Sequence, residues 1–352
     1  METQISIFDP LDAHLHIRQG QMMKDVLPYT AAHCGAAVIM GNLAEPIDDL
    51  DRLLCYRYEV QQVIDELKLS FTPIMTIMLT PHTTVEIIRA CAPEAKVLKL
   101  IPANTSTNSK TGVALGDLRK CYPILEELQK HEMIFSIHAE QIMDSGKLVA
   151  EEDREEAALP FVERIIRDFP GLKIIIEHVS TRAACQLILE SPKNVAGTIT
   201  AHHAIFSDLF LKNPQGGIRP EFYCKPVLKS EKNRETVAWS MLSDCGRFFF
   251  GSDSAPHPWA KKFESDPPAA GIFSAPSAIP FITEAFFQAG RLDGLENFLS
   301  VYGRKFYGLP YATKKVTLRR DPDNKFTFPL TVGEDKIPVL AGGHTQRWFI
   351  TR

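Results

Sequence analysis

The feature that most restricts how this chain can fold is a regular alternation of short apolar runs with amphipathic stretches. Near-continuous apolar runs are typical of strands that are buried on both faces of a parallel sheet. The predicted strands are residues 5–17, 36–41, 71–79, 95–102, 133–139, 172–179, 195–203 and 247–255. The amphipathic stretches between them have apolar residues at helical spacing and predict helices. The clearest helices are predicted at residues 48–67, 117–131, 155–169 and 230–244.

The number of strands favours one class of fold. Eight predicted strands alternating with helices predict an α/β chain that folds as a (β/α)8 barrel of the TIM type, which needs about 250 residues. We expect the barrel to form a hydrolase domain over residues 1–310, with a short C-terminal extension, residues 311–352, packed on it. A turn is predicted at residues 321–324. An open doubly wound sheet is the competing architecture, but no nucleotide-binding glycine motif follows any predicted strand.

The composition excludes several classes of function. A net charge of −4 argues against nucleic acid or an anionic membrane as the partner, since both select basic surfaces. No apolar run approaches the roughly 20 residues that span a bilayer, and the N-terminal stretch lacks the pattern of a signal peptide. The seven cysteines are scattered and form no C-x-x-C pair, so we expect a cytoplasmic protein without a disulfide framework. Any metal would then bind through histidine and carboxylate side chains.

The stretch "DAHLHIRQG", residues 12–20, places His14, His16 and Arg18 at alternate positions. On a strand, residues two apart point to the same face. Two neutral imidazoles side by side suit a metal ion, and the guanidinium beyond them suits an anion. A solvated edge strand with a chance histidine pair is the alternative.

Polar residues at the ends of other predicted strands decide between these interpretations. In a (β/α)8 barrel the active site lies at the C-terminal ends of the strands. Alone, each such residue could be a hydrogen-bonded core residue or a turn cap, but one site with two metal ions would account for most of them together. They are Asn42, Lys99, His138, His178 and Asp253.

Lys99 is the least expected of these residues, because it lies in the apolar run "VLKLI". A buried, unpaired lysine is disfavoured unless its charge is removed or compensated. A neutral amine can react with carbon dioxide to give a carbamate. That reaction would remove the ammonium and supply a carboxylate long enough to reach two ions.

Six stretches carry a resemblance to a known family. They resemble the amidohydrolase superfamily and, within it, the dihydroorotases of the single-function bacterial type, over about residues 10–310. The stretches are "HLHIR", "KLIPANTSTNS", "SIHAE", "EHVST", "RPEFYCKPVLK" and "GSDSAPH". The chain departs from the family pattern with "MGN" for "MPN", "HAE" for "HGE", and Lys225 where leucine is usual.

The resemblance implies two zinc ions per chain and a role for each matching residue. One zinc would be held by His14, His16 and Asp253, and the second by His138 and His178. Carboxylated Lys99 and a hydroxide would bridge the two ions, and Asp253 would act as the catalytic base. The substrate would contact His16, Arg18, Asn42, His138, His257, and the backbone at Lys225 and Ala270. Ser106 and Thr107 would form the tip of a lid, residues 104–112.

The activity that the resemblance implies is the reversible cyclisation of N-carbamoyl-L-aspartate to L-dihydroorotate in pyrimidine biosynthesis, carried out by a homodimer. One alternative is another cyclic amidase, of the dihydropyrimidinase or allantoinase type. Arg18 and Asn42 favour a substrate with a carboxylate. A second alternative is a non-catalytic structural homologue, which the intact ligand set disfavours. The adjacent His202 and His203 are expected to diverge, with at most one facing the site in a supporting role.

Overall fold

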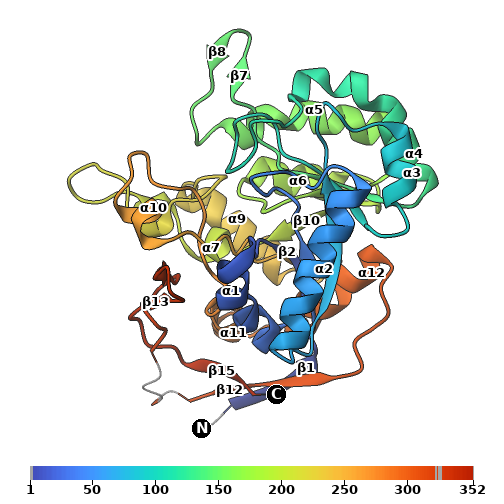
Figure 1. The fold of residues 1–352 in the computed structure, drawn as a ribbon. Coiled ribbons are helices and arrows are strands. Elements are labelled where there is room, and N and C mark those ends of the chain that lie inside the picture. The colour runs from blue at the N-terminus through green and yellow to red at the C-terminus, as the bar shows by residue number, and fades with distance from the viewer. Residues whose placement is uncertain (1–2, 322, 324–326, 352) are drawn as a thin grey trace.

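A nearly closed barrel of eight parallel strands forms the centre of the molecule, with helices around it (Figure 1). The computed structural model describes residues 3–321, 323 and 327–351. The strands lie in the order β11-β10-β9-β6-β5-β4-β3-β2, and the predicted (β/α)8 fold is confirmed. Their bounds are β2 Leu11–Leu15, β3 Ala36–Ile39, β4 Thr72–Met78, β5 Val97–Leu100, β6 Ile134–Ile137, β9 Lys173–Ile176, β10 Val195–Ile199 and β11 Phe248–Phe250.

The first and last strands of this sheet meet and close the barrel. A parallel bridge joins Leu15 to Ser254. The His16 amide donates to the Ser254 carbonyl oxygen at 3.1 Å, and the Asp253 amide donates to the His14 carbonyl oxygen at 2.9 Å. The seam therefore brings the end of β2 against the segment that follows β11.

The helices follow the strands as the alternation predicts. All four helices predicted from the sequence are present, although the second begins as a 3₁₀ turn, Leu115–Cys121, before α4. Pro123 lies in the first turn of α4, where its missing N–H has no intrahelical partner to lose. The main helices are α1 Gly20–His33, α2 Leu50–Glu66, α3 Val85–Cys91, α4 Tyr122–Lys130, α5 Arg154–Asp168, α6 Arg182–Glu190, α7 Ala201–Ile205, α9 Glu231–Leu242 and α11 Ala278–Gln288.

The prediction of one strand over residues 5–17 is wrong, because the chain forms two strands there. β1 (Thr3–Phe8) ends before Asp9 and Pro10, and β2 begins at Leu11. Pro10 has no N–H to donate, which favours a break in the strand. β1 instead pairs antiparallel with β12 (Lys315–Arg320), which pairs with β15 (Trp348–Thr351). The turn predicted at 321–324 includes residues outside those that the structure describes.

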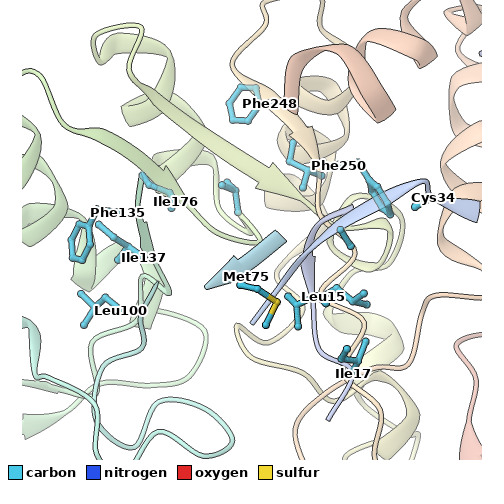
Figure 2. Close-up of a cluster of buried hydrophobic side chains, with 14 of the residues drawn as sticks. Leu15, Ile17, Cys34, Met75, Leu100, Phe135, Ile137, Ile176, Phe248 and Phe250 are labelled. Carbon is cyan, nitrogen blue, oxygen red and sulfur yellow. The ribbon is translucent and has the colours of Figure 1, made fainter. Parts of the chain in front are cut away.

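Strand alternation divides the core into two layers. Side chains such as Leu100, Phe135 and Ile176 lie on neighbouring strands in a cluster of buried hydrophobic residues (Figure 2). A smaller cluster includes Val97 and Ile175. Since residues two apart share a strand face, the face of Val97 continues into Lys99. The barrel therefore has an apolar floor, and polar side chains begin at its C-terminal mouth.

The C-terminal segment contacts the rest of the molecule at more than the β1 edge. The Trp348 indole donates to Glu284 Oε2 of α11 at 2.7 Å, and a bridge joins Phe273 to Val339. Among the described residues, the structure contains no helix that is both long and apolar enough to cross a bilayer.

Candidate active site

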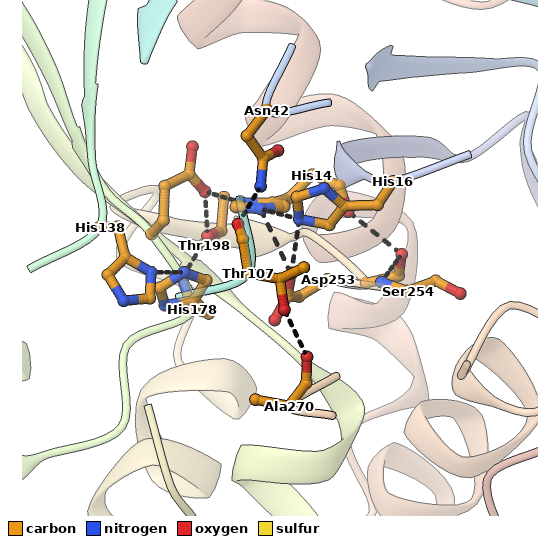
Figure 3. A network of polar contacts seen from close by, with 12 residues as sticks. His14, His16, Asn42, Thr107, His138, His178, Thr198, Asp253, Ser254 and Ala270 are labelled. Carbon is orange, nitrogen blue, oxygen red and sulfur yellow. Dashed lines mark hydrogen bonds and ion pairs between the residues drawn. The ribbon is translucent and has the colours of Figure 1, made fainter. Parts of the chain in front are cut away.

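Three candidate metal ligands converge at the seam of the barrel (Figure 3). His14 Nε2 lies 3.2 Å from His16 Nε2, and Asp253 Oδ1 lies 3.3 Å and 3.1 Å from these two nitrogens. All three side chains are buried. Nitrogen and carboxylate oxygen atoms at such separations can surround one zinc-sized ion. Burial raises the pKa of the Asp253 carboxyl above its usual value, although the neighbouring histidines oppose this shift.

A second pair of histidines lies beside the first set. His138 Nδ1 is 2.9 Å from His178 Nε2, and the His178 ring centroid is 5.1 Å from that of His14. These residues follow β6 and β9, so their backbones are placed by adjacent strands. Two facing imidazole nitrogens can share one proton or ligate one ion, and the pair is therefore a second candidate ligand set.

Lys99 lies fully buried within this group of side chains. Among the described residues, its Nζ has no hydrogen-bond partner, and the nearest carboxylate oxygen, Glu177 Oε1, is 3.9 Å away. Burial lowers the pKa of the Lys99 amine to about 8, with Glu177 and Asp253 opposing the shift. The lowered pKa increases the fraction of the neutral amine, which is the form that reacts with carbon dioxide. The unpartnered nitrogen fits a group that a further ligand or modification completes.

A buried carboxylate that the sequence analysis missed, Glu177, organises this centre. His14 Nδ1 donates to Glu177 Oε2 at 2.8 Å, which leaves His14 Nε2 free to face the other ligands. Thr198 Oγ1 donates to the same carboxylate at 2.6 Å, and Ser136 Oγ donates to its other oxygen. Burial raises the pKa of Glu177, but Lys99 and His14 outweigh it and hold that pKa at about 2.

Two more buried carboxylates support the ligands. Glu140 Oε2 lies 2.8 Å from His138 Nε2, so His138 presents Nδ1 to His178. Asp12 accepts from the Ser252 amide at 2.8 Å and from its hydroxyl at 2.5 Å, beside the barrel seam. Burial raises the pKa of Asp12 to about 7. Each of these acidic residues lies one or two positions from a predicted ligand in an otherwise apolar run. This proximity was the sequence signal that could have identified them as supporting residues.

Arg18 is not part of the strand that carries His14 and His16. β2 ends at Leu15, and Arg18 adopts a left-handed backbone with φ of 61°. The prediction that these three residues share a strand face is therefore wrong, although Arg18 still reaches the site. Its Nη2 lies 3.3 Å from His257 Nε2, which is 2.9 Å from the Ala270 carbonyl oxygen. The structure thus brings together Arg18, His257 and Ala270.

Two of the candidate ligands also have unusual backbone conformations. His178 and Asp253 have φ of 39° and 43°. Residues other than glycine adopt positive φ infrequently and at a cost on the order of 1–3 kcal/mol. The fold holds both ligands in this region, which is common at functional sites.

The predicted lid, residues 104–112, contacts both sides of the predicted substrate pocket, the residues Arg18, Asn42, His257 and Ala270. Asn42 Nδ2 donates to the Thr107 carbonyl oxygen at 3.3 Å, and Thr107 Oγ1 donates to the Ala270 carbonyl oxygen at 3.2 Å (Figure 3). Ser106 makes its hydrogen bonds within the loop, to Ser109 at 3.0 and 2.6 Å. Thr107 therefore joins Asn42 to Ala270 across the mouth of the barrel.

For Lys225, sequence reasoning considered only a backbone contact with the substrate, and the structure shows what its side chain contacts. Its Nζ pairs with Glu151 and lies 4.9 Å from the centroid of the Tyr223 ring. The Tyr223 hydroxyl donates to the same Glu151 oxygen at 3.3 Å. Lys229 Nζ donates to the Glu151 carbonyl oxygen at 3.1 Å. Through these contacts Glu151 links the segment that carries Lys225 to the segment that follows β6.

The expectation that His202 and His203 diverge is wrong. Both are buried in α7, and their ring centroids are only 4.6 Å apart. Successive side chains on a helix differ by about 100°, which does not prevent both rings from lying on the buried side. The His203 ring centroid is 6.5 Å from that of His178, so the pair lies next to the ligand set.

Comparison with known proteins gives one family over the whole chain. The family described as amidohydrolase matches residues 12–187. The dihydroorotase of Teredinibacter turnerae is 37% identical over 359 residues, which cover 100% of each chain. The structure of dihydroorotase from Saccharomyces cerevisiae in complex with 5-fluoroorotic acid matches with a TM-score of 0.90 and 30% identity, over 99% of this chain and 98% of the other.

A more distant structure shares the fold alone. L-hydantoinase (dihydropyrimidinase) from Arthrobacter aurescens matches with a TM-score of 0.77 but 16% identity, over 99% of this chain and 89% of the other.

Proposed function

The chain belongs to the dihydroorotase family of amidohydrolases, which act on cyclic amides, and we propose that it catalyses the reversible, zinc-dependent cyclisation of N-carbamoyl-L-aspartate to L-dihydroorotate in pyrimidine biosynthesis. The observation that carries the proposal is the convergence of four imidazoles and Asp253 around a buried lysine whose Nζ has no hydrogen-bond partner among the described residues.

The residues present fit two divalent ions. His14, His16 and Asp253 would hold one ion, and His138 and His178 would hold the other. Lys99, once carboxylated, would supply the oxygens between them, which accounts for its buried and unpartnered Nζ in the described structure. When bound, such ions supply an activated water and polarise the carbonyl group that it attacks.

The chain's own residues orient the substrate and move protons. Arg18 and Asn42 would bind the substrate carboxylate, with His257 and the backbone of Ala270 beside them. Thr107, held between Asn42 and Ala270, would exclude water from this side. Buried Arg–carboxylate contacts are charge-assisted and directional, so they would fix the ring relative to Asp253.

Asp253 would act as base and then as acid. In the hydrolytic direction it takes a proton from the attacking water and delivers one to the ring nitrogen as the amide C–N bond breaks. A carboxylate can accept a proton from water and later return it, which is the role of a general base followed by a general acid. In the biosynthetic direction the same steps run in reverse.

The substrate class is tested by comparing turnover of L-dihydroorotate, hydantoin and allantoin by protein of measured zinc content. We expect L-dihydroorotate to be the preferred substrate and zinc to be present at about two ions per chain or more. Preference for hydantoin or allantoin would favour another cyclic amidase. No turnover of any of the three would favour a structural homologue.

The cysteines are scattered along the chain and form no C-x-x-C pair, which supports a further proposal that the protein works in the cytoplasm. On the family resemblance we propose that it does so as a homodimer. Light scattering of the purified protein would test the second point, and a monomer mass would contradict it.

A further inference from the structure

A buried cluster beside the candidate active site contains two histidines and a cysteine that the proposed reaction does not use. His202, His203 and Cys224 are each at most 3% exposed. One ligand atom from each lies within 4.8 Å of the others. The two histidines lie in the first turn of α7, whereas Cys224 belongs to the segment that carries Lys225. The cluster therefore joins two parts of the chain that are distant in sequence.

The separations within the cluster are close to those around a single ion. Cys224 Sγ is 3.9 Å from His203 Nε2. The carbonyl oxygen of Pro226 lies 3.2 Å from that sulfur and 3.0 Å from that nitrogen. Around a tetrahedral zinc ion, with bonds of about 2.0–2.3 Å, neighbouring ligand atoms are roughly 3.3–3.8 Å apart. The three separations lie just outside that range, so shifts of a few tenths of an ångström would place these atoms on one face of a tetrahedral site.

His202 supplies the second, independent observation. Its side chain is fully buried, and within the described part of the chain neither ring nitrogen has a hydrogen-bond partner. Leaving a buried polar group without a partner is unfavourable, so such a group in a native core indicates a missing partner such as a ligand or an ion. The neutral imidazole offers one lone pair, and a metal ion would satisfy it.

We propose that His202, His203, Cys224 and the carbonyl oxygen of Pro226 form a further site for a zinc-type divalent ion, separate from the dinuclear site. Cysteine and histidine ligands together select Zn²⁺ over harder ions such as Mg²⁺ or Ca²⁺. The ion would fasten the segment with Lys225 to α7. Its role is structural, because the protein supplies all four ligands and leaves no open position.

The protons balance in a simple way. On binding, Cys224 loses its thiol proton to solvent, and the thiolate sulfur becomes the ligand. His203 keeps one proton but moves it from Nε2, which donates to Pro226, to Nδ1. Thr200 Oγ1 lies 2.9 Å from that Nδ1 and can accept the proton there. One proton is therefore released per ion bound.

Cobalt substitution distinguishes this site from the dinuclear one. None of the residues proposed to hold the dinuclear site has a sulfur atom, so only the further site can produce a thiolate-to-cobalt charge-transfer band in the near ultraviolet. We expect that band in the Co²⁺-loaded wild-type protein. We expect it to be lost in Cys224→Ser and weakened in His202→Asn. The control variant Cys185→Ser, which removes a buried cysteine of α6, should keep the band.

Metal analysis of the zinc-loaded protein gives a second measurement. Wild type should hold about one ion per chain more than Cys224→Ser, since a thiolate is a strong zinc ligand. Absence of the cobalt band from wild type, or its persistence in Cys224→Ser, would overturn the proposal and leave water as the partner of His202. The wild-type spectrum decides even if a variant fails to fold. L-dihydroorotate turnover without the band would overturn this site alone, whereas the band without turnover would count against the proposed function alone.

Discussion

The candidate metal centre and the predicted substrate pocket next to it are built in different ways. The ligands of the centre lie in the last residues of barrel strands or shortly after them, and buried carboxylates such as Glu177 and Glu140 hold their imidazoles. The pocket is assembled from loops, and Arg18 Nε and Thr107 Oγ1 each donate to a backbone carbonyl oxygen. The centre is thus a fixed constellation, whereas the pocket depends on a few contacts between loops.

This difference predicts how each region responds to substitution. Loss of a ligand in the centre should destroy the site, since no neighbouring side chain can replace it. Changes in the pocket should weaken substrate binding or closure and leave the metal content intact. The predictions below test this division, beginning with the largest expected effect.

Lys99→Ala should remove the bridge of the metal centre. Because an ion contributes several kcal/mol of transition-state stabilisation, we expect turnover of L-dihydroorotate to fall at least about a thousandfold, together with metal content. Short carboxylic acids should restore part of the activity by replacing the carbamate. Lys96→Ala, at an exposed lysine nearby, is the control. Wild-type turnover in Lys99→Ala would show that the carbamate hypothesis is wrong.

Arg18→Met should affect binding of the substrate carboxylate without affecting the ions. Charge-assisted hydrogen bonds contribute about 1.5–3 kcal/mol each, so we expect KM for L-dihydroorotate to rise about a hundredfold. Dihydrouracil, the same ring without the carboxylate, should be affected much less. Equal losses on both substrates would indicate a structural role for Arg18.

Glu177→Gln tests whether the hydrogen bond that orients His14 is needed for metal affinity. The amide would present N–H groups to donors that now face a carboxylate, and His14 would lose its fixed orientation. Removing such a partner commonly lowers metal affinity about 10–100-fold. Competition with a chelator measures this, with the exposed Glu156→Gln as control. Unchanged affinity would mean that the strand backbone alone positions His14.

The double variant Ser106→Gly with Thr107→Gly should have the smallest effect of the four. Loss of the two hydroxyl groups that are proposed to cover the substrate should lower kcat by more than about tenfold. Metal content and thermal stability should stay close to wild type. Thr111→Gly, in the same loop, is the matched control. A variant that loses metal along with activity would place the loop in the scaffold of the centre and break the division between the two regions.

The sequence predicted the regular parts of the molecule better than the irregular ones. Apolar strands separated by helices define a barrel, and the barrel places strand-end residues such as Lys99 and His178 together. Asp9 and Pro10 marked the break between β1 and β2, but the prediction of one strand over residues 5–17 ran through them. The left-handed backbone of Arg18 has no sequence signal comparable to a glycine. Family resemblance, rather than periodicity, indicated the residues of the pocket.

The supporting carboxylates were missed for a different reason. A glutamate that follows an apolar strand resembles any solvated residue at a strand end. Its role depends on which donors lie opposite, and for Glu177 these are Ser136 and Thr198 on neighbouring strands. Such contacts between strands depend on register, which a single sequence does not give.

The pairing of β1 with β12 also affects how the chain folds during synthesis. Ser6 and Thr317, whose hydroxyls lie 2.9 Å apart in this pairing, are 311 positions apart. At a translation rate of about 5–20 residues per second, β1 waits on the order of tens of seconds for its partner. During that interval its backbone N–H and C=O groups form an open strand edge with Ile5 and Ile7 nearby, which is a liability for aggregation. The barrel can close earlier, once β11 has emerged, so the outer sheet is the last part of the fold to be protected.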